Sequence, residues 1–128
     1  MILLDTCALL WLAADQAKLS MKARETIGNN PERLFVSAIS AFEIAIKTQR
    51  GKLELPMAAN VWFEKVLRKH GIQEIAISSF IAAQSVSLPP LHNDPCDRFI
   101  IATALQNSMA VVTCDALIAQ YQEIKVIW

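Results

Sequence analysis

The sequence predicts an α/β fold in which helices cover both faces of a parallel β-sheet. Short apolar runs alternate with helical patterns along all 128 residues, and parallel strands require such crossover helices. The expected strands are continuously apolar, which is typical of strands buried on both faces. No internal repeat, low-complexity tract or linker interrupts the pattern. We therefore expect one domain over residues 1–128 with a single hydrophobic core.

The first strand and helix follow from the N-terminal residues. Residues 1–4 are a short apolar run, and Asp5 ends it. Asp5 or Thr6 can cap a helix over residues 6–14, where Leu, Trp and Ala recur at helical spacing. A second, more exposed helix is expected over residues 20–29, because Ser20 can cap it and a Gly-Asn-Asn-Pro turn ends it.

The middle of the chain predicts two strands and three helices. Residues 34–36 form the second strand, and a helix follows from Ser37 or Ser40 to about Arg50, where Gly51 stops it. The first two turns of this helix are apolar all round, which predicts burial. The remaining elements here are an amphipathic helix over 58–70, a strand over 74–77 and a helix from Ser78 or Ser79 to residue 87.

The C-terminal third begins with an extended loop over residues 88–91, because residues before proline avoid the helical region. Asp94 is then a helix N-cap, Pro95 occupies the first helical position, and Asp97 falls in the first turn. That helix covers 97–107. A fourth strand over 110–113, a short helix over 115–120 and a possible fifth strand over 124–128 complete the chain.

Composition limits the classes of function. The chain is 54% hydrophobic and 19% charged, and this apolar surplus predicts a surface that meets a partner. No apolar run approaches the roughly 18 to 20 residues that span a bilayer, so we expect a cytoplasmic protein without membrane contact. Lys and Arg number 12 and Asp and Glu number 12, so any contact with nucleic acid must be local.

The three cysteines predict neither a disulfide framework nor a zinc site. Cys7, Cys96 and Cys114 are odd in number and form no C-x-x-C pair. We expect them to be buried structural thiols in a reducing compartment.

Four acids lie beside the apolar segments. Asp5 and Asp115 follow strands, Glu43 lies within two turns of the second strand, and Asp97 begins the helix before the fourth. In a parallel sheet these positions converge at the carboxyl edge, near the point where the strand order reverses. Converging carboxylates repel each other unless their pKa values rise or a divalent cation supplies charge.

The donor chemistry indicates which cation and which reaction. Oxygen ligands without a cysteine or histidine cluster favour Mg²⁺ or Mn²⁺ over zinc. A cation held by Asp5, Glu43 and Asp97, with Asp115 completing a second site, is suited to phosphodiester hydrolysis.

Structural roles for the same residues remain open at this level. Asp5, Asp94 and Asp115 can each be simple N-caps, and Ser40 to Glu43 matches a capping box. Glu43 can also pair with Lys47 one turn on. The basic residues also have alternatives. His92 can contact a phosphate, contact Asp94 or only pack in the interior, and Arg98 can clamp a phosphate or pair with Asp94 or Asp97. Three further cations can either line an RNA path or form a solvated helix end: Lys47, Arg50 and Lys52.

The chain resembles, end to end, the PIN-domain toxins of bacterial type II toxin-antitoxin modules, the VapC-like ribonucleases. The similar blocks are Leu3-Leu4-Asp5-Thr6, Ala8-Leu9-Leu10-Trp11, Val36-Ser37-Ala38, Glu43-Ile44-Ala45-Ile46-Lys47, Gly51-Lys52-Leu53, Leu88-Pro89-Pro90-Leu91-His92, Asp94-Pro95, Asp97-Arg98, Ile101-Ala102-Thr103-Ala104 and Val112-Thr113 with Asp115. Together these blocks are specific for this family. Taken singly, only the block of residues 92–104 would be specific for it.

This resemblance implies a three-layer α/β/α sandwich with a parallel sheet of four to five strands. It also implies a metal-dependent endoribonuclease that is inhibited by a cognate antitoxin and forms a homodimer. The family's acidic quartet falls on Asp5, Glu43, Asp97 and Asp115. Supporting roles are expected for Thr6, His92, Asp94, Arg98 and Thr113, with Lys47 and Arg98 as candidate substrate contacts.

Two positions depart from the resemblance, because Cys7 replaces a usual histidine and Cys96 a usual phenylalanine. Neither removes an acid, so the quartet does not predict a dead enzyme. The competing interpretations are an inactive PIN-like binding module and another Mg²⁺-dependent phosphate-handling α/β domain. A P-loop is disfavoured because no G-K-[ST] sequence occurs.

Overall fold

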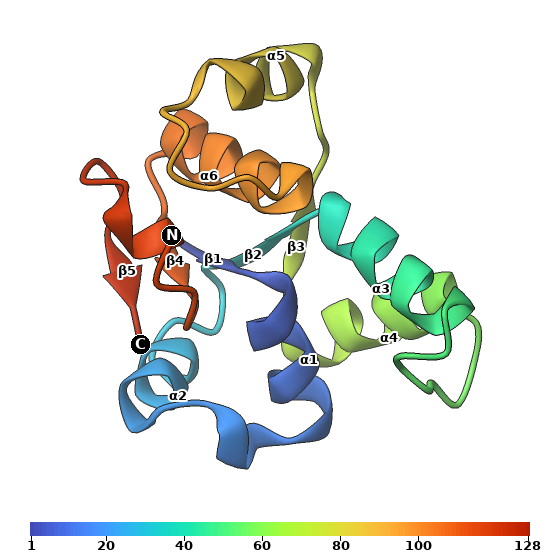
Figure 1. The fold of residues 1–128 in the computed structure, drawn as a ribbon. Helices are drawn as coiled ribbons and strands as arrows, with labels where there is room; N and C mark the ends of the chain where they lie inside the picture. The colour runs from blue at the N-terminus through green and yellow to red at the C-terminus, as the bar shows by residue number, and fades with distance from the viewer.

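The computed structural model describes residues 1–128 and contains a five-stranded parallel sheet (Figure 1). The strands are β1 Ile2–Leu4, β2 Leu34–Ser37, β3 Gln73–Ile75, β4 Ala110–Val112 and β5 Val126–Ile127, in the order β3-β2-β1-β4-β5. The predicted parallel α/β sheet is therefore confirmed, and its possible fifth strand is present. β1 lies at the centre, where it pairs with β2 on one side and β4 on the other.

Alternate residues of the strands point into two hydrophobic layers, as the strand period of two requires. On one face, Leu4 and Val36 pack beneath α1 (Thr6–Ala14), α2 (Met21–Gly28) and α4 (Ala59–His70). On the other face, Leu3 and Val111 pack beneath α6 (Pro95–Asn107), against which α5 (Ser79–Ser87) lies (Figure 1). The result is the expected three-layer sandwich.

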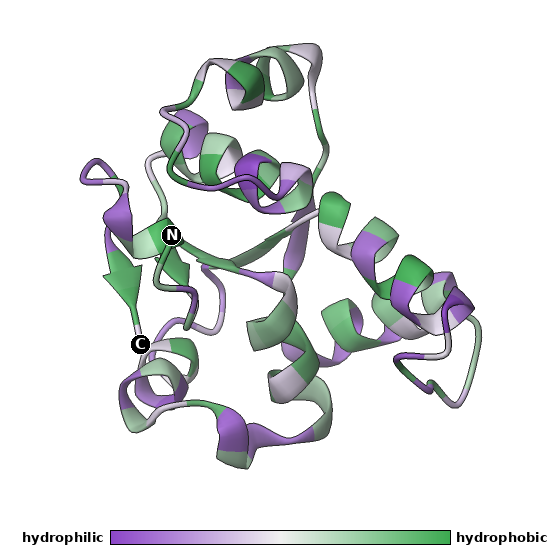
Figure 2. Ribbon diagram, in the orientation of Figure 1, coloured by the Kyte–Doolittle hydropathy of each residue, from purple (hydrophilic) through white to green (hydrophobic).

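One edge of the sheet is polar. β3 exposes Gln73 and Glu74 to solvent, and Figure 2 shows this strand as hydrophilic beside the hydrophobic centre of the sheet. Charged or polar residues on an edge strand discourage pairing with another chain. β3 ends at Ile75, two residues before the predicted end of this strand.

Helix caps explain most of the predicted helix starts. The side chains of Ser20, Ser78 and Asp94 accept hydrogen bonds from backbone N–H groups of α2, α5 and α6. The helix α3 (Ile39–Gln49) is different, because the Ser37 hydroxyl accepts from the Ile39 N–H and the helix begins before Ser40. The predicted capping box from Ser40 to Glu43 is therefore wrong.

The segment after Asp115 forms only a short 3₁₀ turn, η2 (Ile118–Gln120), rather than the predicted helix over 115–120. A second 3₁₀ turn, η1 (Gln16–Lys18), follows α1. None of the helices is both long and apolar enough to span a bilayer.

Candidate active site

Buried polar side chains collect where β1 and β4 end side by side. The strand order reverses at this pair, since the chain continues from β1 toward β2 on one side and reaches β4 on the other. Crevices at such switch points are the usual ligand sites of parallel sheets. Five of the eight buried polar residues lie here: Asp5, Thr6, Ser40, His92 and Thr113.

Asp5 is the most buried acid of the group, with 6% of its surface exposed. One carboxylate oxygen caps α1 by accepting from the Ala8 N–H at 2.8 Å, and the other accepts from the Thr113 hydroxyl at 2.5 Å. Burial raises the pKa of Asp5 to about 6, because desolvation outweighs both hydrogen bonds. The cap predicted for Asp5 is present, and its second oxygen is also engaged.

Thr6, the first residue of α1, contacts Glu43 on α3. The Thr6 hydroxyl donates to Oε1 of Glu43 at 2.6 Å and lies 2.9 Å from the Ser40 hydroxyl, which can in turn donate to it. Burial raises the pKa of Glu43, and the Thr6 hydrogen bond offsets part of that rise. Glu43 forms no ion pair with Lys47, the pairing considered above.

His92 lies between Asp97 and Asp115. Its Nε2 is 2.8 Å from Oδ2 of Asp115 and 3.2 Å from Oδ2 of Asp97. The Asp94 N–H donates to Nδ1 at 3.1 Å, so Nδ1 is an acceptor and the ring proton resides on Nε2. His92 therefore donates toward the two acids rather than to the Asp94 carboxylate.

The two acids beside His92 differ in how easily they ionise. Burial, followed by the charges of Asp94 and Glu43, raises the pKa of Asp97 to about 7. Burial also acts to raise the pKa of Asp115, but hydrogen bonds from His92 and from the Leu117 N–H outweigh it and lower the net value. At neutral pH the site thus combines an ionised acid with one that holds a proton part of the time.

These side chains fit a divalent cation by their donor chemistry. The nearest carboxylate oxygens of Asp97 and Asp115 lie within 4.8 Å of each other, and the ring N–H of His92 donates toward both. The charges of Asp115 and Glu43 act to raise the pKa of Asp5, as the charge of Glu43 does for Asp97. The negative charges of the acids therefore act on one another, and a hard cation that prefers oxygen ligands would offset their repulsion.

The alternative in which Arg98 pairs with an acid is wrong. Its guanidinium donates only to backbone carbonyl oxygens, those of Ser85, Val86, Leu88, Pro89 and His92, at 2.9 to 3.3 Å. It forms no ion pair with Asp94 or Asp97. Arg98 thus ties the end of α5 and the following loop to the start of α6.

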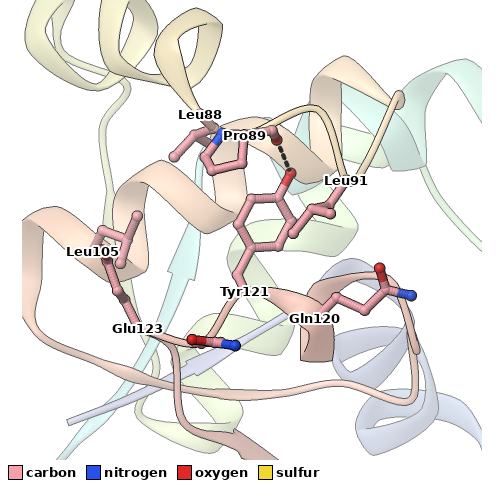
Figure 3. Close-up of a pocket in the computed structure, with 8 residues that line it drawn as sticks. Leu88, Pro89, Leu91, Leu105, Gln120, Tyr121 and Glu123 are labelled. Atoms are coloured by element: carbon pink, nitrogen blue, oxygen red, sulfur yellow. Dashed lines mark hydrogen bonds between the residues drawn. The ribbon is translucent and has the colours of Figure 1, made fainter.

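Tyr121 is a contributor that sequence reasoning missed. Its hydroxyl donates to the Pro89 carbonyl at 2.7 Å and accepts from the His92 N–H at 3.1 Å. The ring also lines a cavity of about 430 Å³ beside Leu88, Pro89 and Leu91 (Figure 3). No sequence signal marks this residue, because its partners lie about 30 positions away and are backbone atoms.

The cysteines correct a further prediction. Cys114 is exposed, and Cys7 and Cys96 are only half-buried, so the expectation of buried thiols is wrong. Burial raises the pKa of Cys96 to about 11, with Glu43 adding to the rise. Its thiol is therefore protonated at neutral pH and a poor nucleophile or metal ligand.

Comparisons with known proteins identify the family of the chain. A family model described as PIN domain matches residues 2–124. Ribonuclease VapC22 of Mycobacterium tuberculosis is 34% identical over 115 residues, which cover 89% of this chain and 86% of that protein.

Solved structures give the same fold. The DNA-bound VapBC2 structure from Rickettsia felis matches with a TM-score of 0.71 and 12% identity, over 98% of this chain and 97% of that one. DNA-bound VapBC from Salmonella typhimurium matches with a TM-score of 0.69 and 15% identity, over 98% and 95%. The family match covers nearly the whole chain, and the chain belongs to the PIN-domain family.

Proposed function

We propose that this protein is a metal-dependent endoribonuclease and the toxin of a type II toxin-antitoxin module. The observation that supports the proposal is the group of raised carboxyl pKa values: burial, with the charges of Glu43 and Asp115 adding to it, raises the pKa of Asp5 to about 6 and that of Asp97 to about 7. Raised carboxyl pKa values at a shared site are typical of acids that operate with a cation.

The four acids would hold Mg²⁺ or Mn²⁺ through their carboxylate oxygens. A divalent cation in such a site supplies charge for polarising a phosphodiester and for lowering the pKa of a water molecule. Thr113 fixes one oxygen of Asp5, and Thr6 fixes one oxygen of Glu43. His92 fixes Asp115. Hydroxyl and imidazole groups that orient carboxylates in this way reduce the reorganisation needed for binding.

The comparisons support the RNA substrate and the protein partner of the proposal. Ribonuclease activity is stated in the name of the M. tuberculosis relative, which supports RNA as the substrate here. The likeness to chains in VapBC complexes and in a toxin-antitoxin complex from Klebsiella pneumoniae supports a cognate antitoxin as partner. The apolar surplus of the sequence supports a homodimer.

Cleavage of RNA by the purified chain tests the proposal. Total cellular RNA would be incubated with Mg²⁺, Mn²⁺ or chelator, using wild type, Asp5→Asn, Asp97→Asn and a Glu64→Gln control on the exposed surface of α4. We expect discrete metal-dependent fragments from wild type and the control only. If wild type is inert while all variants fold and bind a partner protein, the binding-module interpretation replaces this one.

A further inference from the structure

We propose that a groove along α3, beginning at Glu43, is a subsite for single-stranded RNA in which Phe42 stacks on a base and basic side chains contact phosphates. The proposal rests on the proposed function, because it assigns part of that enzyme's substrate path. It names the residues that would bind the RNA on one side of the acidic site. None of these residues belongs to the acidic quartet except Glu43, which marks where the groove begins.

The groove is a cavity of about 250 Å³ lined by α3, the turn that follows it and one residue of α6. Phe42 and Ile46 provide its apolar lining, while Lys47, Arg50 and Lys52 provide cations. Glu43 and Cys96 also line it, and Cys96 immediately precedes Asp97. The groove therefore runs from the acidic site outward along the helix for roughly 10 Å, given the helical rise per residue.

Phe42 is exposed in a way that packing does not explain. It is 53% exposed and belongs to neither hydrophobic core, although its neighbours Ile39 and Ile44 on the same helix are buried. Ile46 lies one turn further on and is half-buried. A phenyl ring presented beside an aliphatic side chain offers a flat apolar surface of the kind on which unpaired bases stack.

The cations of the groove have no carboxylate partners. The ion pairs of the structure are Lys18 with Asp15 and His92 with Asp97 and Asp115. Lys47, Arg50 and Lys52 therefore remain available to an external anion. In a chain whose formal net charge is zero, this local positive field is the kind that guides a phosphate backbone.

Single-stranded RNA fits this combination better than a protein segment does. An aromatic platform flanked by unpaired cations recognises stacked bases and backbone phosphates together. An acidic peptide would be attracted by the cations but repelled by the carboxylates at the Glu43 end of the groove. RNA would meet the same carboxylates, but in the proposed enzyme a cation would neutralise them where the scissile phosphate lies.

Binding measurements test the subsite separately from cleavage. The affinity of a fluorescent single-stranded RNA for wild type, Phe42→Ala, Phe42→Trp and Phe80→Ala would be measured by anisotropy with Ca²⁺ present, so that a cation neutralises the carboxylates. Phe80 is the matched control, because it is 58% exposed but lies on α5. We expect Phe42→Ala to bind about 5- to 50-fold more weakly, Phe42→Trp to retain affinity and Phe80→Ala to match wild type.

An abasic scan of the same RNA identifies the stacked base. Removing one base at a time should weaken binding to wild type at one position and have no effect there on Phe42→Ala, because the contact is already lost. Combined replacement of Arg50 and Lys52 by alanine should reduce the salt dependence of binding. Unchanged RNA affinity of Phe42→Ala, or loss confined to binding of a partner protein, would overturn the proposal.

The two proposals can fail independently. Binding of RNA through Phe42 without any metal-dependent cleavage would reject the enzyme and retain the subsite. Cleavage of RNA with full activity and affinity in Phe42→Ala would retain the enzyme and reject the subsite.

Discussion

Arg98 donates a hydrogen bond from Nη1 to the carbonyl oxygen of His92 at 2.9 Å. Through the other bonds of its guanidinium, Arg98 holds the chain from Ser85 to Pro89 at the same time. The Tyr121 hydroxyl holds the same loop, because it donates to the Pro89 carbonyl and accepts from the His92 N–H. The imidazole that orients Asp115 is therefore fixed by its own backbone as well as by its ring contacts.

Arg98→Lys is expected to destabilise the protein by about 1–3 kcal/mol, because an ammonium cannot reproduce the planar set of donors and leaves carbonyl oxygens unpaired. The matched control is Arg68→Lys on the exposed surface of α4. Thermal unfolding measures the difference, and amide hydrogen exchange should accelerate over residues 86–92. Equal melting temperatures and exchange rates in both variants would show that the carbonyl contacts contribute nothing.

The contrast between Asp94 and Arg98 shows what the sequence can predict. Asp94 acts on the N–H groups of Cys96 and Asp97, so its capping role depends only on local spacing and on Pro95. Arg98 acts on carbonyl groups up to 13 positions away, and every residue carries such a group. Charge alone therefore suggested acidic partners that the fold does not provide.

In the acidic site, too, some positions can be predicted from the sequence, whereas some contacts depend on the fold. The positions of Asp5 and Asp115 follow from strand ends, so their approach to one edge is predictable from a parallel topology. The contact between the hydroxyl groups of Thr6 and Ser40 depends on how closely α1 approaches α3, which no sequence spacing specifies. His92 could be recognised as a motif residue, but its contact with Asp115 required the loop geometry that Arg98 and Tyr121 impose.

Thr113→Val should raise the pKa of Asp5 further above about 6, because the Thr113 hydroxyl is the strongest contact that favours its ionised form. The substitution also removes the acceptor for the Asp115 N–H, so we expect a loss of about 1–3 kcal/mol in unfolding free energy. Carbon NMR of the carboxyl group as a function of pH measures the shift. Thr113→Ser retains the hydroxyl and should titrate like wild type, and identical titration of the valine variant would contradict the assigned contact.

Asp97→Asn should stabilise the metal-free protein at pH 8. The pKa of Asp97 is about 7 in the folded state, against 3.8 for an ordinary aspartic acid, so between about pH 4 and 7 the folded state binds more protons and stability falls as pH rises. Asparagine removes this cost. Since one pKa unit corresponds to about 1.4 kcal/mol and water reaches part of the carboxyl, we expect a gain of about 1–3 kcal/mol at pH 8.

The same gain should vanish below about pH 3, where the aspartic acid is protonated in both the folded and the unfolded state. Melting temperatures of wild type and Asp97→Asn across this range, measured with chelator, give the comparison. Glu64→Gln is the control for loss of one negative charge far from the site. A constant difference between Asp97→Asn and wild type at all pH values would show that the raised pKa is not its origin.

Mn²⁺ should raise the melting temperature of wild type more strongly at pH 8 than at pH 6. If the acids hold a cation, binding must release the protons that Asp5 and Asp97 retain at the lower pH, since their pKa values are about 6 and about 7. A ligand at a hundredfold its dissociation constant stabilises by roughly 2.7 kcal/mol, an effect that chelator should reverse. Asp97→Asn should lose most of the metal-induced increase, whereas Glu64→Gln should keep it. An increase of the same size in Asp97→Asn at both pH values would place the bound cation elsewhere on the molecule.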